Sequence, residues 1–216
     1  MTASPAPRLG RPPKLRRDEV LDGALSLGLP SFTVARLAVL LGVSEGALYH
    51  HFASRDEIVD AACSRLFEQV DTEAPTDVDA ARPADGEDWQ RYLEAICAQI
   101  RTLAIEQPGF GPWLVAGSYD QPTLRRFERI LVGITRRAPQ FDDDTAYLVG
   151  SQAVACTVGL VVSGFVGSVP EQPTEHDLDE QFRWMLRSLL RGMAAQLADG
   201  VPPPRRQALD PDASTG

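Results

Sequence analysis

The chain has 216 residues, 44% of them hydrophobic, and a formal net charge of −9. This length suits one compact core or a small head on a larger body, and the apolar fraction excludes global disorder. The three cysteines are far apart and form no CxxC pair, which argues against a disulfide scaffold or zinc finger and predicts a reducing, cytoplasmic compartment.

The N-terminal residues 1–17 form a basic arm, although the whole chain is acidic. This arm contains no acidic residue, whereas residues 71–88 carry seven acidic residues against one arginine. Local charge rather than net charge decides where a polyanion binds, so the arm is a candidate for DNA contact. The alternative is a terminus that is simply solvated. The candidate contacts are Arg8, Arg11 and Lys14.

Four short helices are predicted between residues 18 and 70. Apolar residues recur at helical spacing from Asp18 until Pro30 ends the first element. Thr33, Ser44 and Ser54 are predicted N-caps of the next three helices, because a side-chain hydroxyl can accept a hydrogen bond from the first-turn N–H groups.

The segment 33–52 (TVARLAVLLGVSEGALYHHF) has the layout of a helix-turn-helix. Ala38 is small where the two helices should cross, and Gly42 permits a left-handed turn. Four apolar residues are predicted to form the inner face: Leu37, Leu41, Val43 and Leu48. Small residues at the start of the second helix would let it approach base edges in the major groove, while hydroxyl and imidazole groups contact phosphates. The predicted outer face consists of Glu45, Gly46, Ala47, Tyr49 and His50. His51 and Thr33 add phosphate donors, and Ser44 belongs to the same candidate DNA-binding set.

Residues 16–67, about a quarter of the chain, resemble the DNA-binding domain of the TetR family. The resemblance lies in the string GVSEGALYHHFASRDEIV. It implies an all-α fold, with a three-helix head containing the helix-turn-helix joined to a larger helical ligand-binding and dimerisation body. It also implies contacts to DNA backbone or bases from Thr33, Arg36, Ala47, Tyr49, His50 and Arg55, with Leu48 and Phe52 in the core.

The sequence departs from the family pattern at three points. Glu45 stands where a non-acidic residue is usual, and it could either read a cytosine amino group or point away from phosphates. Arg55 replaces a usual lysine and keeps the charge. The connection between Ala24 and Thr33 is short, which predicts a shortened first helix.

Beyond an acidic linker at 71–88, helices are predicted near residues 87–106, 122–137, 142–168 and 178–198. Aromatic side chains gather around the irregular segment 108–119 and could line an apolar pocket, or could be ordinary core. Gln152 and Cys156 would be polar ligand contacts or satisfied core groups. The candidate pocket residues are Trp89, Phe110, Trp113, Leu114, Tyr119, Phe127, Tyr147, Gln152 and Cys156.

The uncharged stretch 145–169 is rich in small residues that permit close helix–helix approach. With the last helix it would form the four-helix dimer interface that the family resemblance implies, the alternative being packing within one chain. The candidate interface residues are Gly159, Ser163, Gly167, Phe182, Met185, Leu189 and Met193. The same stretch is long enough to cross a membrane, so a membrane-tethered DNA-binding sensor is a second hypothesis.

The predicted domains are a flexible basic arm (1–17), a DNA-binding domain (18–70), an acidic linker (71–88), a ligand-binding and dimerisation domain (89–199) and a disordered tail (200–216). The predicted function is a dimeric transcriptional regulator, with repression as the family default, released from a palindromic DNA operator by a small apolar or amphipathic effector. No nucleophile motif, P-loop or dinucleotide loop is present, so no enzyme activity and no cofactor are predicted. The acids beside His176 fit helix capping better than a metal site, and no metal is predicted.

Overall fold

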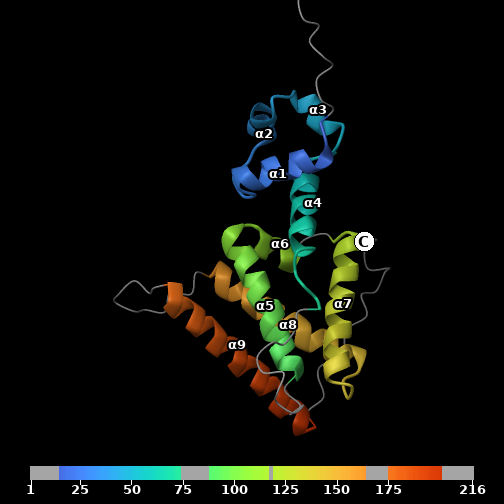
Figure 1. Cartoon of the computed structure of the whole chain (residues 1–216), viewed down its shortest axis with the longest axis vertical. Helices are drawn as coiled ribbons and strands as arrows, with labels where there is room; N and C mark the ends of the chain where they lie inside the picture. The colour runs from blue at the N-terminus through green and yellow to red at the C-terminus, as the bar shows by residue number, and fades with distance from the viewer. Residues whose placement is uncertain (1–14, 74–87, 117–118, 164–174, 201–216) are drawn as a thin grey trace, which may run out of the picture. The chain divides into compact units, whose positions relative to one another are not determined.

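The computed structural model describes residues 15–73, 88–116, 119–163 and 175–200, and within these ranges the regular structure is entirely helical. This confirms the all-α prediction. The helices are labelled in Figure 1. In chain order they are α1 (Arg17–Leu27), α2 (Val34–Leu41), α3 (Glu45–Tyr49), α4 (Arg55–Phe67), α5 (Asp88–Glu106), α6 (Phe110–Ala116), α7 (Gln121–Arg137), α8 (Asp143–Val162) and α9 (Glu175–Ala198).

The chain forms two compact units, Met1–Ala62 and Cys63–Gly216, which we call the head and the body. The division falls inside α4, whereas the sequence pattern places the end of the first domain at residue 70. The last turn of α4 belongs to the body because its side chains pack there. The Phe67 ring lies 4.7 Å from the ring of Phe127 on α7.

The core of the head is built from one face of each of its helices. Leu37 and Leu48 are buried as predicted, and so is Phe52, while Leu41 and Val43 of the predicted inner face are only half-buried. Ala38 is buried as expected. The closest approach of α1 to α2 depends on Gly23, where an added Cβ would lie 2.8 Å from Leu37 Cδ1.

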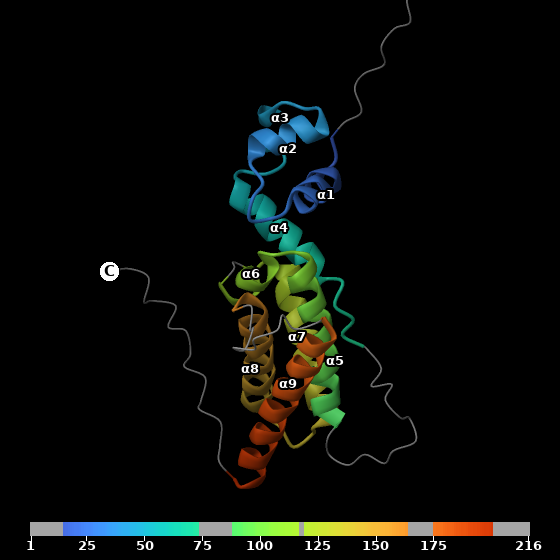
Figure 2. The same cartoon turned by 90° about the vertical axis from the view of Figure 1, so that its left-hand side faces the viewer.

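In the body, α8 packs against α5, α6, α7 and α9 (Figures 1 and 2). It is the one helix among the described residues that is long and apolar enough to cross a membrane. Its buried side carries Val149, Ala153 and Val158. Because packing against four neighbours accounts for a helix that carries no charge after Asp143 and Asp144, the membrane-tethered alternative is not favoured. The predicted continuation to residue 168 lies outside the described residues.

Helices α5 and α7 approach so closely that one position must be glycine. A Cβ added at Gly133 would lie 2.2 Å from the hydroxyl oxygen of Tyr92. The Tyr92 ring is fully buried, its hydroxyl donates to Thr72 O at 3.1 Å, and the Arg137 guanidinium carbon lies 4.3 Å from the ring centroid. Burial raises the pKa of Tyr92 to about 12.

Candidate functional site

The helix-turn-helix is defined by the two caps and the turn that the sequence predicts. Thr33 Oγ1 accepts a hydrogen bond from Arg36 N at 3.2 Å where α2 begins, and Ser44 Oγ accepts from Ala47 N at 3.2 Å where α3 begins. Gly42 between the helices has φ 65°, the left-handed conformation that glycine adopts without strain. Local chemistry therefore fixes both ends of the turn.

The outer face of α3 is open to solvent and has little steric bulk near its N-terminus. Glu45, Gly46 and His50 are exposed, Ala47 is half-buried, and the Tyr49 side chain is 51% exposed. Leu48 is the buried residue of this helix. A short rod with small residues at one end and a tyrosine further along can approach base edges and also contact a phosphate.

Two hydroxyls of the predicted DNA-binding set, those of Thr33 and Ser44, already serve as caps. Both residues are exposed at the N-terminal ends of α2 and α3. Arg36 is exposed in the first turn of α2. These groups are suited to binding phosphate oxygens.

Arg55 has an internal role that the resemblance does not indicate. Its Nε donates to Phe32 O at 3.0 Å and its Nη2 to Leu29 O at 2.7 Å, and its guanidinium carbon lies 4.6 Å from the Phe32 ring centroid. The side chain is 37% exposed. Arg55 therefore ties the loop before α2 to the start of α4, and its implied DNA contact stays a prediction.

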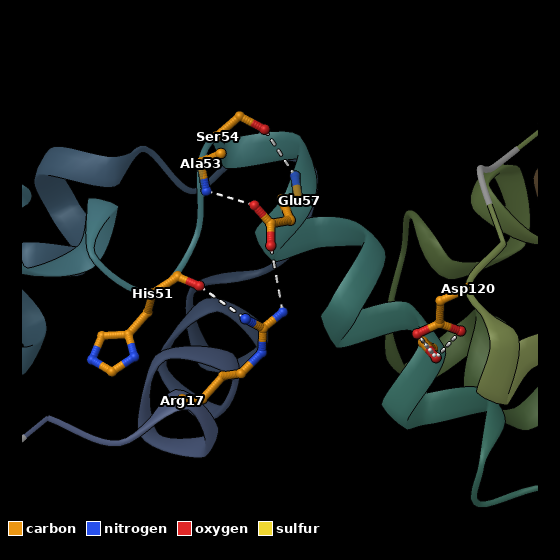
Figure 3. A network of polar contacts seen from close by, with 7 residues as sticks. Arg17, His51, Ala53, Ser54, Glu57 and Asp120 are labelled. Carbon is orange, nitrogen blue, oxygen red and sulfur yellow. Dashed lines mark hydrogen bonds and ion pairs between the residues drawn. The ribbon is translucent and has the colours of Figure 1, made fainter.

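A second polar network joins the start of α1, the end of α3 and the start of α4 (Figure 3). Arg17 Nη1 donates to His51 O at 2.8 Å, and Arg17 Nη2 lies 3.6 Å from Glu57 Oε1. His51, a predicted phosphate donor, is half-buried. Sequence reasoning counted Arg17 with the basic arm and so missed its contacts. The other arm candidates, Arg8, Arg11 and Lys14, lie outside the described residues.

Four of the predicted pocket aromatics come together in the body, joined by one that sequence reasoning did not include. Rings make successive contacts with centroid separations of 4.7–6.5 Å: Phe110, Trp113, Tyr119, Phe127 and the additional Phe67 of α4. We call these five rings the aromatic cluster. Phe67 could have been found from its place on the apolar face of the predicted fourth helix. Leu114, also predicted, is buried beside the cluster, and its carbonyl accepts the Tyr119 hydroxyl.

The remaining predicted pocket residues do not belong to this cluster. Trp89 packs edge-on against Phe141 at 5.2 Å and is buried there, so it is an ordinary core residue. Gln152 is exposed, and Tyr147 is 37% exposed. An exposed amide on the outside of α8 corrects the expectation that Gln152 is an internal polar contact.

Cys156 is half-buried, and burial raises the pKa of its thiol. The thiol of Cys97 on α5 is fully buried, which raises its pKa to about 12. Both thiols are therefore protonated near neutral pH, so neither supplies a thiolate nucleophile.

The aromatic cluster adjoins a polar junction between α4 and α7. Asp120, the N-cap of α7, accepts hydrogen bonds from Ser64 Oγ at 2.9 and 3.0 Å, and from Thr123 N at 2.9 Å. Burial alone would raise the pKa of Asp120, but the hydrogen bonds from Thr123 and Ser64 together lower it. Arg126 donates to the backbone carbonyls of Val70 and Glu68 just beyond α4. The last turn of α4 is thus held to α7 by polar and apolar contacts.

The candidate dimer residues divide into exposed and buried groups. Gly159 on α8 and its C-cap residue Ser163 are exposed, and a Cβ added at Gly159 would meet nothing within 4 Å. On α9, three of the candidates, Met185, Leu189 and Met193, are half-buried. Gly167 lies outside the described residues.

Phe182 corrects the prediction, because it is buried within the chain with the Arg101 guanidinium carbon 5.1 Å from its ring centroid. The exposed aromatic on this helix is Trp184, at 70%. A tryptophan off the apolar stripe of the predicted helix is the signal that could have identified it. Across the described residues, no group of three His, Cys, Asp or Glu side chains is placed to hold a metal ion.

Comparison with known proteins gives consistent matches. Residues 26–62 match the TetR_N family, described as bacterial regulatory proteins of the tetR family. The class C tetracycline repressor of Escherichia coli is 28% identical over 201 residues, covering 87% of this chain and 80% of its own length.

Solved structures with the same fold align with this chain over nearly the full length of the solved chains. A TetR variant from Acinetobacter baumannii in complex with minocycline aligns with TM-score 0.67 and 23% identity, covering 84% of this chain and 98% of that one. BioQ with its double-stranded DNA operator aligns with TM-score 0.60 and 21% identity, and the alignment covers 84% of this chain and 99% of the BioQ chain. With the capped helix-turn-helix, these matches show that residues 26–62 form a TetR_N domain of the kind found in bacterial regulatory proteins of the tetR family, and that the chain shares the helical fold of these solved structures.

Proposed function

We propose that the protein is a dimeric repressor that binds a palindromic DNA operator through its head and releases it when a small molecule binds the body. The observation that carries this proposal is the outer face of α3. Its small residues and exposed Tyr49 stand on a helix whose N-terminus is fixed by Ser44. Such a helix fits the major groove, and two copies read half-sites about 34 Å apart on one side of the duplex.

The dimer provides the second head. Gly159 is exposed on α8, where an added Cβ would meet nothing within 4 Å, and α9 exposes Trp184. A small-residue face permits close helix approach, and an exposed tryptophan is typical of a protein interface. These two features support self-association through α8 and α9. The class C tetracycline repressor, to which this chain is similar, is a repressor by name, and this supports repression as the proposed activity.

The effector is an apolar or amphipathic molecule that contacts the aromatic cluster. Aromatic rings with one phenol, that of Tyr119, suit a ligand with a broad apolar surface and few polar groups. Binding must favour the state of the protein that does not hold DNA, because a ligand shifts an equilibrium only through differential affinity. The structure of a TetR variant with minocycline is a precedent for a small molecule bound to this fold.

We infer a regulator rather than an enzyme, working in the cytoplasm where DNA is accessible. Neither the Cys97 nor the Cys156 thiol is ionised at neutral pH, and the matched relatives are transcriptional regulators. A turnover assay on the purified protein with candidate effectors gives no product if this inference is correct.

The test is selection of bound duplexes from a random pool by the purified full-length protein. The expected result is an enriched palindrome whose affinity falls in Tyr49→Ala and Arg36→Ala. The matched control is Arg125→Ala, which removes the same charge from an exposed position on α7 of the body. If no sequence is enriched, or if both head variants bind as well as the unaltered protein, the proposed function is wrong.

The role of the basic arm is tested separately, by deleting residues 1–15. This deletion should weaken binding to every duplex, and the slope of log affinity against log salt should decrease by about 0.9 for each phosphate that the arm neutralises. An unchanged slope would show that Arg8, Arg11 and Lys14 do not bind phosphate.

A further inference from the structure

The guanidinium of Arg17 is engaged on three sides within the head. It donates to His51 O at 2.8 Å, lies 3.6 Å from Glu57 Oε1, and has its central carbon 4.0 Å from the Phe52 ring centroid. Its side chain is 51% exposed, so these contacts are made at the surface. An arginine that binds phosphate needs its donors directed outward, whereas these donors are directed at the protein.

The position of α3 depends on few other contacts. This helix has five residues and one buried side chain, that of Leu48. A helix of this length is not stable by itself, and its last carbonyl groups lack helical partners. The Arg17 hydrogen bond to His51 O places a positive charge where the helix dipole is negative. Arg17 therefore holds the chain just beyond the C-cap His50 of α3, while Ser44 holds the N-terminal end of this helix.

Glu57 in turn fixes Arg17 to the start of α4 (Figure 3). Its carboxylate accepts from Ala53 N and pairs with Arg17, and its own N–H donates to Ser54 Oγ at 3.1 Å. This differs from a capping box in one bond, because the Glu57 carboxylate accepts from Ala53 N, one residue before the N-cap Ser54, and it also pairs with an arginine. The end of α3 and the start of α4 are thus connected through a carboxylate and a guanidinium to the first turn of α1.

We propose that Arg17, held by Glu57, is a positioning residue that sets the angle at which α3 enters the major groove, and that it does not contact phosphate. The inference rests on the proposed function, because it concerns how the head reads DNA. A misplaced recognition helix no longer reaches the base edges but keeps the electrostatic attraction of the head for any duplex. Positioning therefore predicts a loss of specificity rather than a uniform loss of affinity.

The experiment uses two duplexes: the sequence selected by the unaltered protein, and a scrambled duplex of equal length and composition. Arg17→Ala should lower affinity for the selected duplex about tenfold, the effect of one mismatched base pair, and leave affinity for the scrambled duplex unchanged. Glu57→Gln should likewise lower the ratio of the affinity for the selected duplex to the affinity for the scrambled duplex. The matched control is Arg16→Ala, which removes the same charge one residue earlier, where the side chain contacts Glu19 within α1.

A phosphate contact gives different results. Arg17→Ala would then weaken binding to both duplexes and reduce the salt slope by about 0.9, and Glu57→Gln would strengthen both by removing a negative charge. Either outcome overturns the proposal. An unchanged ratio in Arg17→Ala, with far-ultraviolet circular dichroism showing a folded protein, overturns it too.

Hydrogen exchange of the free protein tests the physical basis without DNA. Arg17→Ala should accelerate exchange of the amides at His51 and Phe52, which donate to Leu48 O at 2.9 and 3.1 Å, while Arg16→Ala leaves them unchanged. If no duplex is selected but these amides are deprotected, the proposed function has failed and the support of α3 by Arg17 has not. If the amides exchange at the same rate in both variants, Arg17 does not hold this end of α3.

Discussion

The head and the body use helices of different length, and the ways in which their helices are held differ accordingly. The helices that lie wholly in the head have 11, 8 and 5 residues, whereas α5, α7, α8 and α9 of the body have 19, 17, 20 and 24, and α6 is the one short helix among the described residues that lies wholly in the body, with 7. Short helices have a large fraction of unsatisfied end groups, so the head depends on caps and on arginine donors. Long helices present more side chains to their neighbours, so the body depends on buried apolar contacts.

This difference has a functional consequence. The contacts that support α3 lie at the surface of the head, where they respond to charge, salt and DNA. The contacts of the body are buried, where they respond to changes in volume. Under the proposed function, the unit that reads DNA therefore has surface contacts around its recognition helix, and the unit that binds the effector has a buried apolar core.

The largest effect is expected from truncating the aromatic cluster. Phe67 is fully buried, with its ring 4.7 Å from Phe127 and 6.5 Å from Phe110. Phe67→Ala should reduce the free energy of unfolding by about 3–5 kcal/mol. Tryptophan fluorescence in denaturant measures this effect in the body alone, because all three tryptophans follow residue 62. Phe67→Leu, which keeps most of the volume, should cost less than about 1.5 kcal/mol.

If Phe67→Ala lowers the free energy of unfolding by less than expected, the body depends less on buried apolar contacts than its difference from the head implies. Such a result would mean that the rings surround space that is already open and can hold an effector without rearrangement. The same titration repeated with an effector bound would then show a larger difference between the variant and the unaltered protein.

Overpacking between α5 and α7 gives the next effect. Gly133→Ala places a methyl group against the buried ring of Tyr92 and should cost about 1–3 kcal/mol, even though alanine is the better helix former. The control is Gly192→Ala on α9, where nothing lies within 4 Å of the new Cβ and stability should rise or stay unchanged. Equal effects of the two substitutions in thermal melts would show that α5 and α7 are not closely packed in solution.

The junction between α4 and α7 gives a smaller effect that depends on pH. Asp120→Asn keeps a capping residue but weakens the acceptor for Ser64 and Thr123, and should cost about 1 kcal/mol at pH 7. Since folding lowers the pKa of Asp120, its carboxylate stabilises the fold above its unfolded value near 3.8, and this contribution is lost as pH falls through the folded value. The two proteins should therefore become equally stable in acid.

Asp142, the N-cap of α8, provides the control for this effect. The hydrogen bonds from Thr145 lower its pKa too, but the group is fully exposed and its capping bond comes from within α8 itself. Asp142→Asn should change stability less than Asp120→Asn at pH 7. A larger change would indicate that the bond to Ser64 contributes little.

The sequence predicts the head better than the body for a reason of distance along the chain. The caps at Thr33 and Ser44 and the turn at Gly42 involve partners three to five residues away, so their spacing is visible in the string of residues. The bond from Ser64 to Asp120 joins residues 56 apart. Helical periodicity identifies which face is buried but not which helix covers it, so neither this bond nor the contact of Gly133 with Tyr92 could be predicted.

The errors at the candidate sites have the same origin. Phe182 and Trp184 lie on one predicted helix, and hydrophobicity alone favours both as buried or interfacial. Only the position of α5, which brings Arg101 over the Phe182 ring, separates a core aromatic from an exposed one. The internal contacts of Arg17 and Arg55 could not be predicted for a similar reason. An arginine that binds backbone carbonyls looks the same in the sequence as one that binds DNA.

The smallest effect is expected at Val39, on the outer side of α2. Its side chain is 82% exposed, while Leu37 two residues earlier is fully buried. Val39→Ala should change the free energy of unfolding by less than about 0.5 kcal/mol, whereas Leu37→Ala should cost several times more. Hydrogen exchange of the α2 amides in the free protein measures both.

A cost above about 1 kcal/mol for Val39→Ala would mean that this side chain is covered in solution, because removing methyl groups from an exposed position leaves no cavity to destabilise the fold. The head would then share with the body a dependence on buried apolar area, and caps and arginine contacts would no longer account for its stability.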